Sequence, residues 1–296
     1  MKILLLGKNG QVGWELQRAL SPLGELVALE RHSKDYCGDL SNPNKLAETI
    51  KLLKPDVIVN AAAYTAVDKA EDEAELSRLI NSEAVKTLAQ SAEKINALLI
   101  HYSSDYVFSG EGEHFWSEDD KTSPLNMYGK TKLEGEQNIQ TYCSNHLILR
   151  TSWVYSTFGN NFAKTILNLA KKKEKLSVID DQYGAPTSAE LIADCTAIAL
   201  VQTLQDKNKC GVYHLVSSGS TNWYLYTKLV THEAQNNGIK LALKELNAIP
   251  ATDYHLPAKR PYNSKMNNNK FKKTFNIELP SWELGVKRLI KELSIK

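Results

Sequence analysis

Apolar residues in the first half of the chain come in short runs, separated by longer stretches with helical periodicity. Trp14, Leu16 and Leu20 illustrate the helical spacing that follows the first run. The runs predict strands at 3–6, 26–29, a third strand that ends at 40, and then 57–59, 98–104 and 147–150. Such alternation predicts a parallel sheet with right-handed crossovers.

The alternation becomes less regular beyond residue 151. A long helical stretch is predicted earlier, over about 70–95, and later elements are predicted at 176–179, 189–204, 213–216, 225–236 and 282–293. We therefore expect an α/β fold, a Rossmann-type doubly wound parallel sheet with a smaller mixed α/β substrate-binding domain. The dinucleotide-binding domain is expected over 1–152, completed by about 176–205, and the substrate-binding domain mainly over 153–175 and 206–296.

Three glycines, Gly7, Gly10 and Gly13, follow the first predicted strand directly. A strand, a G-x-x-G-x-x-G turn and a helix are typical of a dinucleotide-binding site. The first glycine allows a tight turn, the second lets the backbone approach a pyrophosphate, and the third lets helix and strand pack closely. The phosphates then face the free N–H groups of the helix N-terminus. A tight turn without a ligand is the alternative, and the position directly after an apolar strand disfavours it.

Glu30 ends the second predicted strand, about 20 residues past the glycines, where a carboxylate can bind the hydroxyls of an adenosine ribose. A solvated strand end is the alternative. The small residues 60–63 permit close approach of a ligand, or simply tight packing. NADH and NADPH both remain open, because the charge of Glu30 disfavours a 2′-phosphate whereas Lys8 and Arg31 could receive one.

Tyr128 and Lys132 form a Y-x-x-x-K motif, whose spacing places both side chains on one face of a helix. A nearby ammonium favours the phenolate, so we expect Lys132 to lower the pKa of Tyr128. Ser104, at the mouth of the preceding strand, could hydrogen-bond a substrate oxygen. A surface pair is the alternative for the motif alone, but together with the glycine turn the catalytic interpretation is favoured.

The glycine turn, Ser104 and Tyr128-x-x-x-Lys132 together resemble the extended short-chain dehydrogenase/reductases. Within that group, the chain resembles the dTDP-4-dehydrorhamnose reductase family in segments 7–16, 60–71, 104–108, 150–155, 159–163, 181–187 and 260–264. The resemblance spans nearly the whole chain. It implies the NAD(P)H-dependent reduction of the 4-keto group of dTDP-4-dehydro-L-rhamnose, the last step of dTDP-L-rhamnose synthesis.

The resemblance also implies roles for individual residues. Tyr128 would donate the proton, Lys132 would hold the nicotinamide ribose, and Ser104 would complete the catalytic set. The implied cofactor-binding residues are Gly7, Gly10, Gln11, Val12, Glu30, Asp39, Leu40, Ala62, Ala63, Tyr64, Thr65, Tyr102, Tyr128 and Lys132. Asp39 and Leu40 would lie beside the adenine. The implied residues for the nucleotide-sugar substrate are Ser104, Asp105, Tyr106 and Trp153.

A magnesium-linked homodimer is a further implication of the resemblance. Glu15, Glu190 and Glu292 are the matching carboxylates, and Mg²⁺ is typically held by one or two carboxylates and several waters. Three solvated surface glutamates are the alternative.

Composition narrows the possible partners of the 296-residue chain. Its formal net charge of +2 gives no reason to expect nucleic acid or an anionic membrane as a partner. No apolar run approaches the roughly 20 residues of a membrane helix, and the N-terminus lacks the flanks of a signal peptide. The four cysteines show no C-x-x-C spacing. We expect a reduced, cytoplasmic protein.

Two alternative functions remain. The first is another nucleotide-sugar enzyme of the same fold, such as a reductase, dehydratase or epimerase. A dehydratase needs a pair of acids after the hydroxyl residue, whereas here Asp105 is followed by Tyr106. The second is a non-catalytic regulatory subunit, which the intact Ser104, Tyr128 and Lys132 disfavour.

Trp153 has two interpretations as well, as a contact for the sugar or as a hydrophobic plug between the domains.

Overall fold

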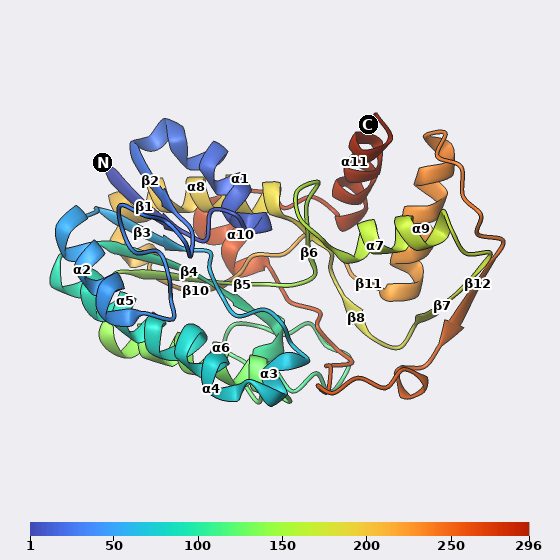
Figure 1. Cartoon of the computed structure of the whole chain (residues 1–296), viewed down its shortest axis with the longest axis horizontal. Helices are drawn as coiled ribbons and strands as arrows, with labels where there is room; N and C mark the ends of the chain where they lie inside the picture. Colours follow the sequence, from blue (N-terminus) through green and yellow to red (C-terminus); the bar gives the residue numbers. More distant parts are fainter. Residues whose placement is uncertain (296) are drawn as a thin grey trace.

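A six-stranded parallel sheet forms the centre of the larger domain in the computed structural model, which describes residues 1–295 (Figure 1). The strand order is β10-β5-β4-β3-β1-β2. The strands are β1 (Lys2–Leu6), β2 (Glu25–Leu29), β3 (Val57–Asn60), β4 (Leu98–Ser104), β5 (His146–Thr151) and β10 (Gly211–His214). This arrangement confirms the predicted Rossmann-type parallel sheet.

Helices cover both faces of the sheet (Figure 1). One face carries α1 (Gln11–Leu20), α8 (Ala189–Gln205) and α10 (Asn269–Phe275), and the other carries α2 (Pro43–Leu53), α5 (Ala84–Lys94) and α6 (Met127–Tyr142). In β1, Ile3 and Leu5 pack in the first layer, while Leu4 and Leu6 pack in the second. Burial on both faces explains why β1 is a continuous apolar run rather than an alternating one.

The smaller domain has its own apolar core. It is built from α7 (Phe162–Ala170), α9 (Trp223–Asn236) and α11 (Trp282–Ser294), which pack around side chains such as Tyr226 and Trp282. Its short strand pairs are β7 (Lys175–Ile179) with β12 (Glu245–Ile249), β6 (Val154–Tyr155) with β9 (Thr187–Ser188), and β8 (Tyr183–Gly184) with β11 (Thr221–Asn222). Among the helices of residues 1–295, none combines the length and apolar character that crossing a membrane requires.

Two predicted elements differ in the structure. The predicted strand that ends at Leu40 is wrong, because Asp39 Oδ1 accepts hydrogen bonds from the backbone and hydroxyl of Ser41 and makes a turn that leads into α2. The segment 147–150 is therefore the fifth strand along the chain, and β10 is the sixth strand of the sheet. The predicted helix 70–95 is interrupted, and consists of α3 (Lys69–Asp72), α4 (Ala74–Arg78), a π-helical turn η2 (Leu79–Glu83) and α5.

The chain passes between the two domains more than once after residue 152. Within 176–205, α8 packs on the large sheet with α1, but β7 pairs with β12 in the smaller domain. Within 206–296, β10 pairs with β5, and α10 packs on the large sheet. Exposed residues alternate with buried ones along β7, which fits a strand with one covered face. We propose a dinucleotide-binding domain that comprises 1–152 together with α8, β10 and α10.

The crossing of α1 over the glycine turn makes a stability prediction. A Cβ added at Gly13 would lie 2.0 Å from the Gly7 carbonyl oxygen, whereas one at Gly10 would meet nothing closer than 3.4 Å. We therefore expect Gly13→Ala to lower the free energy of unfolding by about 1–3 kcal/mol, as overpacking does. Urea unfolding of the cofactor-free protein measures this loss, with Gly10→Ala as the matched control. Equal losses in the two variants would contradict the close crossing.

Candidate functional site

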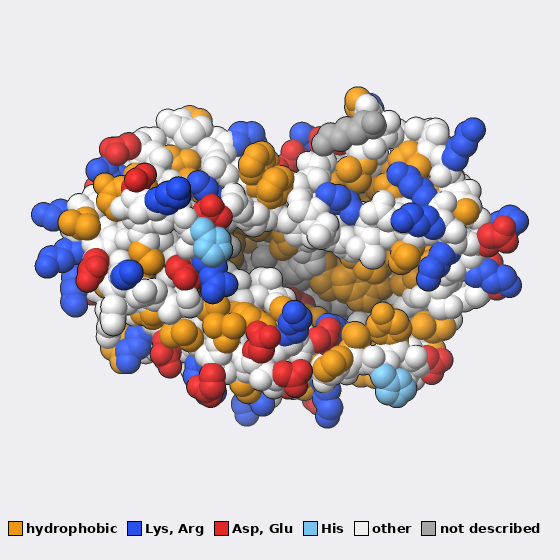
Figure 2. Space-filling view, in the orientation of Figure 1, with side chains coloured by type: hydrophobic (Ala, Val, Ile, Leu, Met, Phe, Trp, Pro, Cys, Tyr) orange, Lys and Arg blue, Asp and Glu red, His pale blue; other side chains and the backbone are white. Residues whose placement is uncertain are grey.

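The candidate site lies at the carboxyl ends of the parallel strands, where ligands of open α/β sheets bind. Figure 2 shows the molecule hollowed between the two domains, with hydrophobic side chains along the smaller domain's side of the hollow. One open pocket of about 410 Å³ lies at Gly112, Glu113, Asp181, Tyr183, Tyr262, Asn263 and Lys265. Of the catalytic candidates, Ser104 lies at the end of β4, and Tyr128 and Lys132 lie in the first turns of α6.

The glycine turn is wedged between β1 and the loop after β3. Gly7 has a φ of 85°, and an added Cβ would lie 2.7 Å from the Ala62 nitrogen. Only glycine fits there without displacing the loop. Gly10 is the N-cap of α1, and nothing comes closer than 3.4 Å to the position of its Cβ. The backbone is therefore open to a ligand at Gly10, beside the N-terminus of α1.

The other candidate cofactor residues surround this turn in varied environments. Asn9 donates a hydrogen bond of 2.7 Å to Glu30, and Arg31 lies 3.6 Å from Asp39. Leu40 is buried in the core beneath the sheet, and Val12 packs against the core of the other face. Ala62 and Ala63 are half-buried and Thr65 is exposed.

Two other cofactor candidates contact distant elements. The hydroxyl groups of Tyr102 and Thr196 share a hydrogen bond of 2.7 Å, so the Tyr102 hydroxyl faces α8. Gln11 accepts a hydrogen bond of 3.0 Å from Asn161 and lies 3.4 Å from the Val154 carbonyl oxygen. The start of α1 is thus joined to the smaller domain.

Helix α6 places Tyr128 and Lys132 against the end of β4. Asn126 caps the helix by accepting a hydrogen bond of 2.8 Å from the Gly129 backbone. A Cβ at Gly129 would lie 2.2 Å from the Tyr106 carbonyl oxygen, and one at Gly135 would lie 2.3 Å from the Asn81 carbonyl oxygen. The two glycines allow α6 to pack directly on the segments that follow β4 and on the π-helical turn.

Ser104 and Asp105 form a buried pair at the end of β4. The Ser104 hydroxyl donates a hydrogen bond of 2.8 Å to Asp105 Oδ1 and accepts one of 3.2 Å from the Tyr106 backbone. Asp105 Oδ2 is buried and has no partner within the described residues. Burial raises the pKa of Asp105 to about 6, although the hydrogen bond from Ser104 opposes the rise. The carboxyl therefore titrates close to neutral pH.

Tyr128 lies beside this pair, with its ring edge-on to Tyr106 at 5.6 Å between centroids. Burial and the charge of Asp105 raise the pKa of Tyr128 to about 12, while the Ser104 hydroxyl acts in the opposite direction. The expectation that Lys132 lowers this pKa is wrong for this structure. Within residues 1–295, the hydrogen bonds of the Lys132 amine go to Tyr102 and His101 of β4. Tyr128 is accordingly a neutral phenol that can donate a proton.

Asn81 is a buried polar residue whose role the sequence did not reveal. Its side chain accepts a hydrogen bond of 2.9 Å from the Tyr64 backbone N–H and donates to the Tyr64 carbonyl at 3.1 Å and to Thr131 at 3.2 Å. It belongs to the π-helical turn η2, and such turns are frequent at functional sites. Asn81 thereby fixes the loop after β3 to α6. The signal in the sequence was an asparagine on an otherwise apolar helical face.

Arg260 and Lys259 connect the C-terminal part of the chain to the same edge. The Arg260 guanidinium binds both carboxylate oxygens of Asp68, at 2.9 and 2.7 Å, in the loop after β3. Asn126 also donates a hydrogen bond of 2.7 Å to the Lys259 carbonyl. Bidentate geometry makes this arginine pair specific in orientation. The segment around Arg260 is therefore held over the start of α6.

Trp153 follows β5 and has a φ of 47°, an uncommon backbone conformation for a large residue. Its ring stacks on Trp223 with centroids 3.5 Å apart. A Cβ at Gly184 would lie 2.7 Å from the same ring. Trp153 thus packs against the core of the smaller domain and remains partly accessible.

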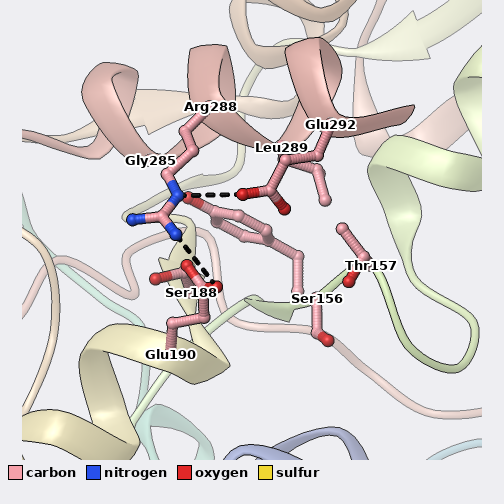
Figure 3. Close-up of a pocket in the computed structure, with 9 residues that line it drawn as sticks. Ser156, Thr157, Ser188, Glu190, Gly285, Arg288, Leu289 and Glu292 are labelled. Carbon is pink, nitrogen blue, oxygen red and sulfur yellow. Dashed lines mark hydrogen bonds and ion pairs between the residues drawn. The ribbon is translucent and has the colours of Figure 1, made fainter. Parts of the chain in front are cut away.

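The three glutamates expected to hold magnesium pair with arginines instead, and Figure 3 shows two of them, Glu190 and Glu292, beside Arg288. Arg288 lies 2.9 Å from Glu292 and 3.4 Å from Glu190, in a pocket between α8 and α11. Glu15 lies 3.4 Å from Arg18. Across residues 1–295 no group of three or more histidine, cysteine, aspartate or glutamate side chains is arranged to hold a metal ion. The expected magnesium site is therefore not supported, because guanidinium groups already balance these carboxylates.

The fold and the site together define a nicotinamide-dependent oxidoreductase of the Rossmann type, with the tyrosine and lysine of the extended short-chain dehydrogenase/reductases. The chain belongs to the family described as "RmlD substrate binding domain", whose sequence model matches residues 1–295.

The similarity to characterised relatives extends over the whole chain. A dTDP-4-dehydrorhamnose reductase from Escherichia coli K12 is 58% identical over 293 residues, which cover 99% of this chain and 98% of that protein. The crystal structure of a dTDP-4-dehydrorhamnose reductase from Clostridium acetobutylicum is 33% identical and has a TM-score of 0.89, with 99% of both chains covered. That of the Bacillus anthracis enzyme, in complex with NADP, is 29% identical with a TM-score of 0.87 and covers 98% of this chain and 99% of that one.

Asp105 makes a prediction about pH and stability. Burial raises its pKa from the ordinary value of 3.8 to about 6 in the folded protein, so folding favours the protonated carboxyl. The stability that this proton provides is present at low pH and is lost as the pH rises from about 4 through about 6. We expect the isosteric Asp105→Asn, which never ionises, to gain stability relative to the native protein over that range, by an amount on the order of 2–3 kcal/mol.

Urea unfolding of both proteins at a series of pH values between about 4 and 8 measures this difference. The exposed Asp253 provides the matched control, Asp253→Asn, in which a carboxylate already surrounded by water is removed. A stability difference between Asp105→Asn and native protein that does not change with pH would contradict the raised pKa.

Proposed function

We propose that this protein reduces the 4-keto group of dTDP-4-dehydro-L-rhamnose to dTDP-L-rhamnose with NADPH or NADH, and that Tyr128 donates the proton. The observation that supports this most directly is that Tyr128 lies beside Ser104 and Asp105 at the end of β4, in a chain 58% identical to a dTDP-4-dehydrorhamnose reductase over nearly its whole length. The absence of a second acid after Asp105 favours a reductase over a dehydratase, since Tyr106 occupies that position.

The glycine turn fits a dinucleotide. The open backbone at Gly10 and the N-terminus of α1 would hold the pyrophosphate, with Gln11 and Val12 at the same turn. Glu30 would bind the adenosine ribose and Asp39 and Leu40 would lie toward the adenine. When bound, the reduced nicotinamide supplies the hydride. The relative from Bacillus anthracis binds NADP, and Lys8 and Arg31 are the cations nearest in sequence that could receive a 2′-phosphate.

Tyr128 acts as the general acid in this proposal. A phenol with a pKa of about 12 is protonated at neutral pH, so it can protonate the oxygen that becomes negative as the carbonyl is reduced. Ser104 would bind the same oxygen after its hydroxyl turns away from Asp105. Lys132 would hold the nicotinamide ribose, and Ala62, Ala63, Tyr64, Thr65 and Tyr102 would border the cofactor.

The sugar would lie between Asp105, Tyr106 and Trp153. One indole face of Trp153 is covered by Trp223, so the sugar would meet the remaining accessible part of the ring. The substrate carries an apolar methyl group, which suits an aromatic contact, and correct placement of the reacting carbon is worth much in rate.

We further propose that the protein is a cytoplasmic homodimer. Trp14 of α1 is 47% exposed although it stacks on Phe158, and Leu284 of α11 is 60% exposed. Large exposed apolar side chains of this kind are candidates for an interaction surface. Magnesium plays no part in this proposal, because Arg18 and Arg288 pair with the carboxylates that would bind it.

Removal of the Tyr128 hydroxyl tests the proposed acid. We expect Tyr128→Phe to lower kcat by about 100- to 10,000-fold, the contribution of a positioned proton donor, while NADPH still binds. Steady-state oxidation of NADPH with dTDP-4-dehydro-L-rhamnose measures the loss. The matched control is Tyr142→Phe at the exposed far end of the same helix, which should retain native turnover. Near-native turnover in Tyr128→Phe would remove Tyr128 from this role.

A comparison of the two stacked tryptophans distinguishes the interpretations of Trp153. Each of Trp153→Ala and Trp223→Ala removes one half of the stack, so both should lose stability, by up to about 3–5 kcal/mol. If Trp153 contacts the sugar, its variant alone should lose a further large factor in kcat/KM, measured below both melting temperatures. Equal kinetic effects in the two variants would support the plug interpretation.

A further inference from the structure

Three fully buried polar side chains lie in a row behind the site, on β3, β4 and α6. Asn60 Nδ2 is 3.0 Å from His101 Nδ1, and His101 Nε2 is 3.1 Å from Lys132 Nζ. Each of the three residues is only 1% exposed. The Lys132 amine also lies 2.6 Å from the Tyr102 carbonyl oxygen. The donors and acceptors in this row determine the protonation state of Lys132.

The orientation of the Asn60 amide is fixed at its other end. Asn60 Oδ1 accepts a hydrogen bond of 3.1 Å from the Ala62 backbone N–H, which can act only as a donor. The amide NH₂ group therefore faces His101 Nδ1, and Nδ1 must accept. A neutral imidazole has one acceptor and one donor nitrogen. His101 Nε2 consequently carries the hydrogen and directs it at Lys132.

If Lys132 were an ammonium, its N–H groups would face the N–H of His101 Nε2, and two hydrogen-bond donors would point at each other. Within residues 1–295 its three hydrogens would have a single acceptor, the Tyr102 carbonyl oxygen, and unsatisfied donors on a buried charge are costly. A neutral amine instead donates to Tyr102 and accepts from His101 through its lone pair. The row of hydrogen bonds is complete only with the neutral amine.

The charges around Lys132 are consistent with this assignment. Glu136 lies one turn further along α6, but Arg150 of β5 binds both of its oxygens, at 2.9 and 2.6 Å, and balances its charge. Burial lowers the pKa of Lys132 to about 8, against the opposing effect of Glu136. Burial and the nearby Lys132 hold the pKa of His101 well below its ordinary value, so the imidazole stays neutral.

We propose that Asn60 and His101 are positioning residues that hold Lys132 as a neutral amine in the cofactor-free protein at alkaline pH, and that binding of a nicotinamide dinucleotide then returns one proton from solvent to Lys132. The inference rests on the proposed function, because it requires the cofactor ribose to reach Lys132. The ribose hydroxyl oxygens would supply the missing acceptors, and the negative pyrophosphate favours a cation. One N–H bond forms at Nζ, and no electron is transferred.

Calorimetric titration with NADPH, in buffers of different ionisation enthalpy, counts the protons taken up on binding. Because the Lys132 pKa is about 8 before binding and higher afterwards, uptake should approach about one proton per site near pH 9 and fall toward zero near pH 6.5. The NADPH dissociation constant should rise by up to about tenfold per pH unit above pH 8. Lys132→Met should take up no proton at either pH.

The substitution Asn60→Asp replaces the amide donor that faces His101 by an acceptor, with almost no change in the shape of the side chain. A carboxylate accepts from both the Ala62 N–H and His101 Nδ1, which moves the imidazole hydrogen to Nδ1 and leaves Nε2 as an acceptor for a Lys132 ammonium. We expect this variant to take up less than about half as much proton as the native protein near pH 9, with a flatter pH dependence of NADPH affinity.

Three outcomes would overturn the inference. Native protein that binds NADPH near pH 9 without proton uptake would overturn this inference alone. The same holds if Lys132→Met or Asn60→Asp takes up as much proton as native protein. Failure of native protein to bind either NADPH or NADH would overturn the proposed function and this inference with it. The native measurement is decisive even if a variant does not fold.

Discussion

The site depends on how closely α6 approaches the end of β4. Gly129 and Gly135 leave no space for a side chain between this helix and the carbonyl oxygens of Tyr106 and Asn81. This contact buries Lys132 against β4 and sets the ring of Tyr128 beside Ser104 and Asp105. A side chain at either glycine would push α6 away from these carbonyl oxygens. The close packing of α6 is therefore the condition for the chemistry of the site.

Burial, rather than ion pairing, dominates the electrostatics of this edge of the sheet. It raises the pKa of Asp105 and Tyr128 and lowers the pKa of Lys132, so each group moves toward its neutral form. The ion pair nearby, Arg150 with Glu136, is bidentate and joins α6 to β5. A site of neutral, hydrogen-bonded groups suits a reaction in which charge develops only as the substrate carbonyl is reduced.

The two domains meet at this edge through specific polar contacts. Arg260 binds Asp68 in the loop after β3, Asn126 binds the backbone of Lys259, and Asn161 binds Gln11 at the start of α1. Each contact joins a segment of the dinucleotide-binding domain to one from the later part of the chain. These contacts therefore fix the later segments of the chain relative to the glycine turn and to α6, on the two sides of the hollow that Figure 2 shows.

The sequence by itself determined the parallel sheet, the glycine turn and the tyrosine and lysine on one helix face, because these depend on local periodicity and spacing. Tertiary structure decided the rest. A turn at Asp39 replaced the predicted strand because side-chain hydrogen bonds competed with strand pairing. The sixth strand of the sheet is β10, which pairs with β5, whereas β7 pairs with β12 in the smaller domain; such pairings join segments far apart in the chain. The pKa of Tyr128 and the pairing of Glu190 and Glu292 with Arg288 depend on burial and on neighbours distant in the chain, which spacing along a sequence does not encode.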